Sequence, residues 1–331
     1  MRVLVTGASG LLGREVARLL VRQGHAVATF QRRPSGVDGA EDFCGSVTDD
    51  QALGRAIAGA EGIIHLAAKV SFTGRAAEFD EVNVEGTRRL LNAARAAGVR
   101  DLVFVSSPSV ANSGAAIAGL GAEPADPEHA HGDYSRTKAK AELLALAADA
   151  PGFRVAAVRP HIVWGPGDTQ LVERVLARAG RGRLPLLDAG AALIDTTYVD
   201  NAASAIVAAL HRIEHIHGRA LVVSNGEPRP VGELLAGICA AGGVTAPSWT
   251  VPGGMARAVG AVVEKVWTWA GRNEEPPMTR FLAEQLSTAH WFDQRETREL
   301  LDWTPAVPLD EGLERLAEHY GSRPLSPRPR S

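Results

Sequence analysis

The chain has 331 residues and a formal net charge of −3, so it is long enough for about two domains and lacks the basic excess of a protein that binds nucleic acid. Its two cysteines, Cys44 and Cys239, have no metal-ligand spacing and cannot form a disulfide framework, which predicts no metal site and a reduced, cytoplasmic location. Neither a secretory signal nor a run of about 20 apolar residues stands out, so we expect no leader and no transmembrane span.

The first 160 residues alternate short β-rich runs with helical stretches. The pattern predicts strands at 2–6, 25–30, 62–66, 102–105 and 155–158, and helices at 11–23, 49–59, 76–97 and 133–149. Such alternation is typical of an α/β fold with a parallel sheet and helices on both of its faces. We therefore predict a Rossmann-type doubly wound domain over 1–160.

The pattern changes after residue 160. Glycine and proline clusters appear at 164–168 and 224–230, and helices dominate from Val231 onward. We predict a smaller, mostly helical substrate-binding lobe over 161–320, with strands and helices that return to the core. The last residues, 321–331, are polar and rich in proline, which predicts a disordered tail.

A glycine-rich turn joins the first predicted strand to the first helix. It runs from Thr6 to Gly13 with the sequence TGASGLLG. Glycines let the backbone approach a pyrophosphate closely, and the N-terminus of the helix supplies N–H groups and the positive end of its dipole. The turn therefore predicts a dinucleotide site.

The end of the second predicted strand indicates which dinucleotide binds. An NAD site typically has an acidic residue there for the ribose hydroxyls, whereas this chain has Gln31, Arg32 and Arg33. Two guanidinium groups suit a 2′-phosphate. We predict NADP(H) rather than NAD(H), with a solvated loop end as the alternative role of the two arginines.

Tyr134 and Lys138 lie four residues apart in a predicted helix, so their side chains project from one face. A cation close to a phenol lowers its pKa, which would make Tyr134 a usable general acid or base. Ser107 follows the preceding predicted strand and can hydrogen-bond a substrate oxygen. The three residues together predict the interconversion of an alcohol and a ketone, and a surface helix with an incidental pair is the alternative.

The chain resembles the extended short-chain dehydrogenase/reductase superfamily over nearly its whole length. The likeness rests on the glycine-rich turn, on the serine that ends its strand, on the sequence YSRTK at 134–138, and on the segments 65–68, 83–87, 159–160, 164–167 and 198–201. It implies an NAD(P)-dependent enzyme in which Tyr134 gives or takes the proton, Lys138 contacts the nicotinamide ribose and Ser107 orients the substrate.

The same resemblance implies a set of cofactor contacts. Besides Tyr134 and Lys138, these are Thr6, Gly7, Ser9, Gly10, Leu11, Leu12, Gly13, Gln31, Arg32, Arg33, Ser46, Val47, Ala67, Ala68, Lys69, Asn83, Pro160 and Ile162. Ser46 departs from the family, which often has an aspartate near the adenine at that position.

Within the superfamily the chain is most similar to the 3β-hydroxysteroid dehydrogenase and 4-carboxysterol 3-dehydrogenase branch, and there to bacterial 2-alkyl-3-oxoalkanoate reductases of olefin biosynthesis. The segments 107–110, 119–122, 224–228, 275–281 and 288–292 carry this likeness. It implies a role in lipid metabolism. The implied reaction is the interconversion of a β-keto acid and a β-hydroxy acid with long apolar chains.

Two apolar segments suit such a substrate. The Ala- and Gly-rich loop at 112–122 and the apolar helix predicted at 255–270 are expected to border its pocket. A weak peripheral contact of that helix with a membrane surface stays open.

Other functions also stay open. A 3β-hydroxysteroid or 4-carboxysterol substrate comes next. A sugar-nucleotide epimerase or dehydratase needs cations for a diphosphate, and the chain offers Arg174, Arg178, Arg181 and Arg183. A non-catalytic NADP-sensing protein would not need the serine, tyrosine and lysine described above. In each case the partner is a small molecule, and a homodimer is compatible with the sequence.

Overall fold

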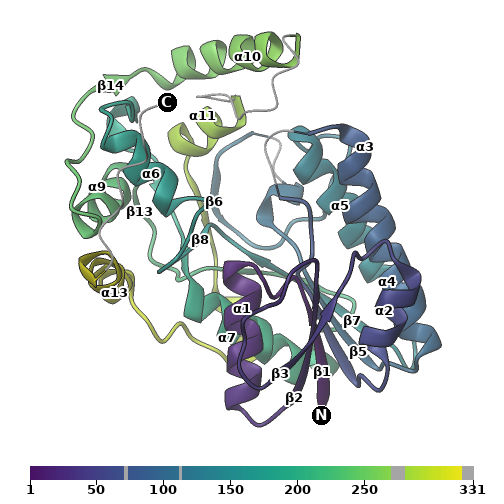
Figure 1. Cartoon of the computed structure of the whole chain (residues 1–331). Coiled ribbons are helices and arrows are strands. Elements are labelled where there is room, and N and C mark those ends of the chain that lie inside the picture. The colour runs from purple at the N-terminus through teal and green to yellow at the C-terminus, as the bar shows by residue number, and fades with distance from the viewer. Residues whose placement is uncertain (71–73, 112–113, 270–279, 323–331) are drawn as a thin grey trace.

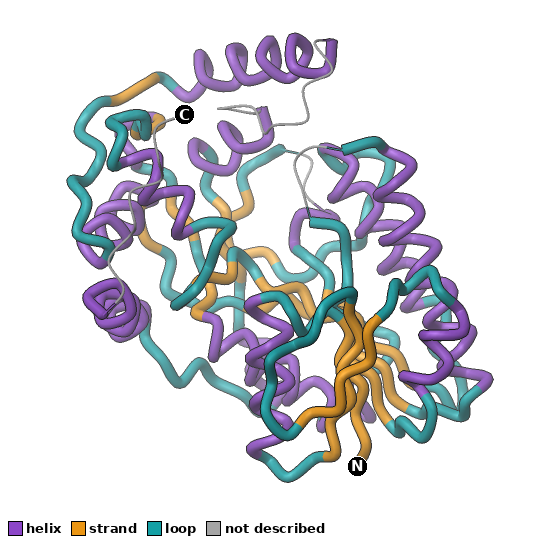
Figure 2. The backbone as a smooth tube through the Cα atoms, viewed as in Figure 1, coloured by secondary structure: helices purple, strands orange, loops and turns teal. Residues whose placement is uncertain are grey.

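A parallel sheet of seven strands, in the order β12-β7-β5-β4-β1-β2-β3, lies at the centre of the molecule, with helices on both faces (Figure 1, Figure 2). The computed structural model describes residues 1–70, 74–111, 114–269 and 280–322. The strands are β1 (Arg2–Thr6), β2 (Ala26–Gln31), β3 (Ala40–Cys44), β4 (Gly62–His65), β5 (Asp101–Val105), β7 (Arg154–Pro160) and β12 (Ala220–Val223). The helices around them are α1 (Leu11–Arg22), α2 (Asp50–Ile57), α3 (Ala76–Phe79), α4 (Gly86–Ala96), α5 (Gly132–Leu146), α7 (Val199–His211), α8 (Ile213–Ile216) and α12 (Arg295–Leu301). The prediction of a Rossmann-type α/β fold is confirmed.

Alternate side chains of the strands build two separate cores. Val3 and Val5 of β1 belong to the core under α1 and α7. Leu4 faces the other side and belongs to the core under α2, α4 and α5. Because both faces are buried, the strands read as continuous apolar runs, which is why most of them could be predicted. Two central strands were not predicted: β3, whose sequence AEDFC is largely exposed and carries two acids, and β12, which lies in the part of the chain where we expected a mostly helical lobe.

The predicted helix at 76–97 contains a wider turn. A π-helical stretch, Asp80–Glu85, lies between α3 and α4. Its buried Asn83 accepts a hydrogen bond from the Lys69 N–H (2.7 Å) and donates one to the Thr137 hydroxyl (3.0 Å). Such turns are frequent at functional sites. Here the turn ties the loop after β4 to α5, the helix that carries the predicted tyrosine and lysine.

A smaller lobe lies beyond the carboxyl ends of the central strands, at the opposite end from the N-terminus (Figure 1). Four short strands in the order β13-β10-β15-β6 form a second sheet there. The helices of the lobe are α6 (Val172–Ala179), α9 (Val231–Ala241), α10 (Gly253–Trp269), α11 (Arg280–Ser287) and α13 (Leu309–Ser322). Its strands are β6 (Ile117–Leu120), β8 (Val163–Trp164), β9 (Leu186–Leu187), β10 (Leu193–Ile194), β11 (Thr197–Tyr198), β13 (Arg229–Pro230), β14 (Thr250–Val251) and β15 (His290–Phe292).

The chain crosses between the lobe and the core more than once. Elements α7, α8, β12 and α12 all follow residue 160 and yet pack on or in the central sheet. The segment 112–122, which we expected to be a loop, contains β6, and β6 pairs in parallel with the distant β15. Helix α13 extends to Ser322, into the predicted tail, and residues 323–331 lie outside the described part of the chain. The division at residue 160 stays a prediction.

Candidate active site

A cavity of about 940 Å³ opens where the central strands end, between the glycine-rich turn on one side and α6, α9, α11 and β15 on the other. This is the crevice at which α/β sheets bind their ligands. The predicted site residues that line it are Gly7, Ser9, Gly10, Leu11, Leu12, Gly13, Ala68, Ser107, Tyr134, Lys138, Pro160 and Ile162.

The glycine-rich turn fits a dinucleotide because two of its positions leave no room for a side chain. Gly7 has φ +77°, and a Cβ atom there would lie 2.9 Å from the Ala67 nitrogen. A Cβ atom on Gly13 would collide with the carbonyl oxygen of Gly7. The first turn of α1 therefore packs closely on the loop after β1, and its Gly10, Leu11 and Leu12 line the cavity. These residues would hold the pyrophosphate of the cofactor.

The predicted catalytic residues meet in this cavity. Ser107 and Tyr134 both line the cavity, and the Ser107 side chain acts to lower the pKa of the Tyr134 phenol. Lys138 is buried, and its Nζ donates to the Val105 carbonyl (2.7 Å) and lies 4.1 Å from the centre of the Phe104 ring. Tyr134 and Lys138 come from α5, one turn apart, and Ser107 follows β5.

The pKa values of Tyr134 and Lys138 are shifted mainly by burial. Burial raises the pKa of Tyr134 to about 12, while the Ser107 side chain acts in the opposite direction. Burial lowers the pKa of Lys138 to about 7, while the nearby Glu142 acts to raise it. The expectation that Lys138 lowers the pKa of Tyr134 is therefore wrong for this structure, because desolvation of the phenol dominates. The phenol is protonated at neutral pH, which is the state that can give a proton to a developing alkoxide.

His65 of β4 forms hydrogen bonds with β1 and α4 and stays neutral. Burial and the charge of Lys138 lower the pKa of His65 to about 3. The Thr87 hydroxyl donates its proton to the Asn83 carbonyl (2.6 Å), so the Thr87 oxygen accepts a hydrogen bond from His65 Nε2 (3.2 Å). The other ring nitrogen, Nδ1, then accepts from the Thr6 hydroxyl (2.7 Å). His65 therefore positions β1 and β4 and holds no proton for the substrate.

Some predicted cofactor residues lie outside the wall of the cavity. They are Thr6, Gln31, Arg32, Arg33, Ser46, Val47, Ala67, Lys69 and Asn83. Lys69 forms an ion pair with Glu78, and the hydroxyl groups of Ser46 and Thr48 are 2.8 Å apart. Their contacts with a cofactor stay predictions.

The end of β2 carries two exposed cations. Arg32 and Arg33 make no hydrogen bond or ion pair with any residue that the structure describes. Gln31 is buried and donates to Asp42 (2.9 Å), an acid on β3 that sequence reasoning missed together with its strand. Burial acts to raise the pKa of Asp42, but hydrogen bonds from Thr29, Ser35 and Gln31 outweigh it and hold the pKa below its usual value.

The lobe side of the cavity is mainly apolar. Its side chains are Leu171, Val175, Leu184, Ile194, Val231, Leu234, Leu235, Leu286 and Phe292. Of the predicted apolar walls, the described part of 112–122 contributes Ile117, and the described side chains of α10 contribute none. Met255, Val259 and Val262 of α10 are 54%, 51% and 61% exposed. The described side chains of α10 therefore do not border the pocket, because helical spacing identifies an apolar face but not what covers it.

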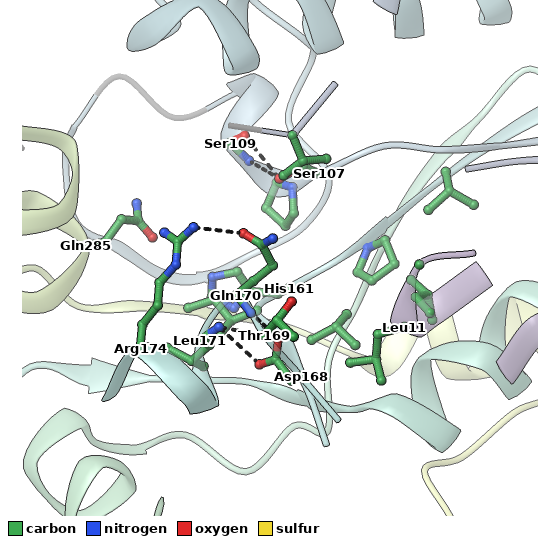
Figure 3. Close-up of a pocket in the computed structure, with 18 of the residues that line it drawn as sticks. Leu11, Ser107, Ser109, His161, Asp168, Thr169, Gln170, Leu171, Arg174 and Gln285 are labelled. Atoms are coloured by element: carbon green, nitrogen blue, oxygen red, sulfur yellow. Dashed lines mark hydrogen bonds between the residues drawn. The ribbon is translucent and has the colours of Figure 1, made fainter. Parts of the chain in front are cut away.

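Polar residues of the lobe also reach the cavity (Figure 3). Of the four arginines that the sequence offered for a diphosphate, Arg174 and Arg178 line the cavity, and Arg181 and Arg183 do not. His290 donates through Nε2 to the Gln285 carbonyl (2.7 Å), so its Nδ1 accepts from His161 Nε2 (3.1 Å). Figure 3 shows Ser107 and Ser109 on one side of the pocket and Arg174, Gln170 and Gln285 on another. Sequence reasoning did not single out the lobe residues His161, Gln170, Gln285 and His290 as site residues, because segments far apart in the sequence supply them.

The chemistry of this cavity is that of an NAD(P)-dependent dehydrogenase or reductase, since a dinucleotide cradle and a phenol that can give or take a proton meet in it. The model of the NAD dependent epimerase/dehydratase family matches residues 3–224, and the chain belongs to this family, in the extended short-chain dehydrogenase/reductase group.

Individual relatives agree with this assignment. A 2-alkyl-3-oxoalkanoate reductase of Stenotrophomonas maltophilia is 39% identical over 96% of this chain and 98% of that protein. A 3 beta-hydroxysteroid dehydrogenase/Delta 5→4-isomerase of Mycobacterium tuberculosis is 30% identical over 97% of this chain and 90% of that protein. Among solved structures, a short-chain dehydrogenase/reductase superfamily protein of Agrobacterium tumefaciens with bound NAD is 25% identical, with a TM-score of 0.74 and 98% of both chains covered. The predicted likeness to the superfamily and to these two kinds of enzyme is confirmed.

Proposed function

We propose that the enzyme uses NADP(H) to interconvert a β-keto acid and a β-hydroxy acid that carry long alkyl chains. The observation that carries the proposal is that Ser107, Tyr134 and Lys138 share one large cavity with a mainly apolar wall. Apolar surface of this kind binds alkyl chains by burial at about 25 cal/mol per Å². The similarity to a protein named 2-alkyl-3-oxoalkanoate reductase supports the same substrate class.

The chain's own residues supply the acid–base part of the reaction. The bound cofactor supplies the hydride that reaches the keto carbon. Tyr134 is protonated at neutral pH because burial raises its pKa to about 12, and it gives its proton to the oxygen as the C–O double bond is reduced. Ser107 hydrogen-bonds the same oxygen and stabilises its developing charge. Lys138 is expected to contact the nicotinamide ribose and to keep the phenol in place.

The preference for NADP(H) rests on Arg32 and Arg33. Both are exposed at the end of β2 and have no partner in the described part of the chain, so both can pair with a 2′-phosphate. The carboxylate of Asp42 is already bound by Thr29, Gln31 and Ser35. This arrangement favours the phosphorylated cofactor.

A substrate panel tests the proposal. The purified enzyme is given NADP⁺ or NAD⁺ with a 2-alkyl-3-hydroxy acid, a 3β-hydroxysteroid or UDP-glucose; the hydroxy acid is used because β-keto acids lose CO₂ in water. We expect the hydroxy acid with NADP⁺ to give the highest kcat/KM. A higher value for the steroid would move the enzyme to the hydroxysteroid branch, and turnover of UDP-glucose would favour an epimerase. Tight cofactor binding without any turnover would indicate a sensor.

Three further expectations remain part of the proposal. We expect a cytoplasmic enzyme, and the proposal is compatible with a homodimer and with a weak peripheral contact of α10 with a membrane surface. Within the described ranges, no helix has the length and apolar character needed to cross a bilayer.

A further inference from the structure

The lobe side of the cavity combines its apolar wall with a fixed positive charge. The titratable side chains that the lobe contributes to the described lining are His161, Asp168, Arg174, Arg178 and His290. Burial lowers the pKa of both histidines, so both are neutral. The two arginines lie four residues apart on α6 and therefore on one face of it.

Asp168 fixes the start of α6. Its carboxylate accepts hydrogen bonds from the N–H groups of Gln170 (2.7 Å), Leu171 (3.1 Å) and Val172 (3.1 Å). Burial acts to raise the pKa of Asp168, and these bonds act to lower it. Its oxygens are therefore engaged with the backbone, and the first turn of the helix, which contains Arg174, is held in place.

Arg174 is half-buried and extends into the cavity. Figure 3 shows its guanidinium group flanked by the side chains of Gln170 and Gln285. Its Nη2 donates to Gln170 Oε1 (3.2 Å). Ser107 and Ser109, whose hydroxyl oxygens are 3.0 Å apart, line the same cavity. A substrate that places its carbonyl oxygen on Ser107 therefore shares a partly desolvated space with a guanidinium group.

We propose that Arg174 binds the carboxylate of the substrate, an inference that rests on the proposed keto-acid function and names the group that recognises the acid. In a β-keto acid the carboxylate is attached to the carbon next to the keto carbon, so it enters the cavity with the reacting group. Moving a carboxylate from water into a partly buried site costs a large free energy unless a partner pairs with its charge. A guanidinium group offers two parallel N–H donors that match both carboxylate oxygens.

The surroundings of Arg174 favour an acid on an alkyl chain over a nucleoside diphosphate. Leu171, which precedes α6, and Val175 on α6 line the cavity beside Arg174, and so does Leu286 of α11. A diphosphate needs several donors around its oxygens, whereas the cations that the lobe contributes to the described lining are Arg174 and Arg178, with Gln170 and Gln285 beside Arg174. A guanidinium group with apolar side chains around it matches a carboxylate followed by hydrocarbon.

The test compares Arg174→Gln with Arg183→Gln, a matched loss of charge at an exposed residue that does not line the cavity. One readout is the oxidation of a 2-alkyl-3-hydroxy acid and of its methyl ester with NADP⁺. The other is the binding of tetradecanoate and of tetradecanol to the NADP⁺ complex. For Arg174→Gln we expect KM for the acid and Kd for tetradecanoate to rise about 10- to 100-fold, with the ester and the alcohol changed less than about twofold. Arg174→Lys should recover part of the loss, and Arg183→Gln should change neither.

Each other outcome has a defined meaning. Equal losses for acid and ester would assign Arg174 a structural role and overturn the inference, and so would an unchanged affinity for tetradecanoate. If the unmodified enzyme oxidises neither hydroxy compound but binds tetradecanoate in a way that depends on Arg174, the proposed function fails while the carboxylate site stands.

Discussion

Tyr134 holds the proton that the proposed reaction needs. Replacing it by phenylalanine keeps the ring and removes the hydroxyl, whose pKa burial raises to about 12. We expect Tyr134→Phe to lower kcat by about 10²- to 10⁴-fold, the usual contribution of a positioned acid, and to leave Kd for NADP(H) within about threefold. Initial rates and a cofactor titration measure both. A variant that keeps more than a tenth of the activity would refute the assignment.

Lys138 makes stability depend on pH. Burial lowers its pKa from 10.5 to about 7, so between these values the folded chain binds fewer protons than the unfolded chain. The cost of the buried ammonium is therefore complete below about pH 7 and fades as the pH rises toward 10.5. We expect Lys138→Met to lose turnover and yet to raise the free energy of unfolding by about 1–3 kcal/mol near neutral pH, with a smaller gain at about pH 9.5. Urea unfolding without cofactor measures this, and a gain that grows with pH would contradict it.

Arg32 tests the choice of cofactor. Arg32→Asp places a carboxylate where a 2′-phosphate is expected, so the ratio of kcat/KM for NADPH to that for NADH should fall below one. Arg22→Asp, at an exposed arginine at the end of α1, serves as the control with the same change of charge. An unmodified enzyme that uses NADPH and NADH equally well would refute the charge argument.

At the scale of single elements, two glycine-to-alanine substitutions test the contact between the glycine-rich turn and α1. One lies at the contact, and the other lies in α2 and serves as the control. A methyl group on Gly13 collides with the Gly7 carbonyl, whereas one on Gly54 of α2 meets no atom within 4 Å. We expect Gly13→Ala to destabilise the fold and to weaken NADP(H) binding at least tenfold. Gly54→Ala should stabilise it by about 0.5–1 kcal/mol, because alanine favours the helix and restricts the unfolded chain. Thermal unfolding and cofactor titration check both, and a Gly13→Ala variant with normal affinity would contradict the close approach.

Elements and residues with local signals could be predicted from the sequence, and those that depend on distant partners could not. The glycine-rich turn and the spacing of Tyr134 and Lys138 predicted residues that the structure brings to one cavity. The exposed strand β3 has no apolar run, and β6 exists only through its pairing with β15. For the same reason the apolar face of α10 was expected to cover the pocket, while the wall comes from α6, α9 and α11.

At the scale of the whole molecule, the two halves of the cavity have different tasks. The edge of the central sheet supplies the dinucleotide cradle and the proton donor, and the lobe supplies an apolar wall with Arg174 in it. Because the chain passes between core and lobe several times, the two are joined by α7, β12 and α12 rather than by one linker. This connection places the apolar wall of the lobe relative to Tyr134.

The length of the alkyl chain tests the central claim most directly. The measurement is kcat/KM for NADP⁺-dependent oxidation of a series of 2-alkyl-3-hydroxy acids of increasing chain length, with UDP-glucose assayed beside them. Burial of each CH₂ contributes about 0.8 kcal/mol, so kcat/KM should rise about fourfold per carbon until the apolar wall is covered, and then level off. UDP-glucose should give no turnover. A series that is flat from the shortest acid onward, together with turnover of UDP-glucose, would contradict the account and favour a sugar-nucleotide enzyme.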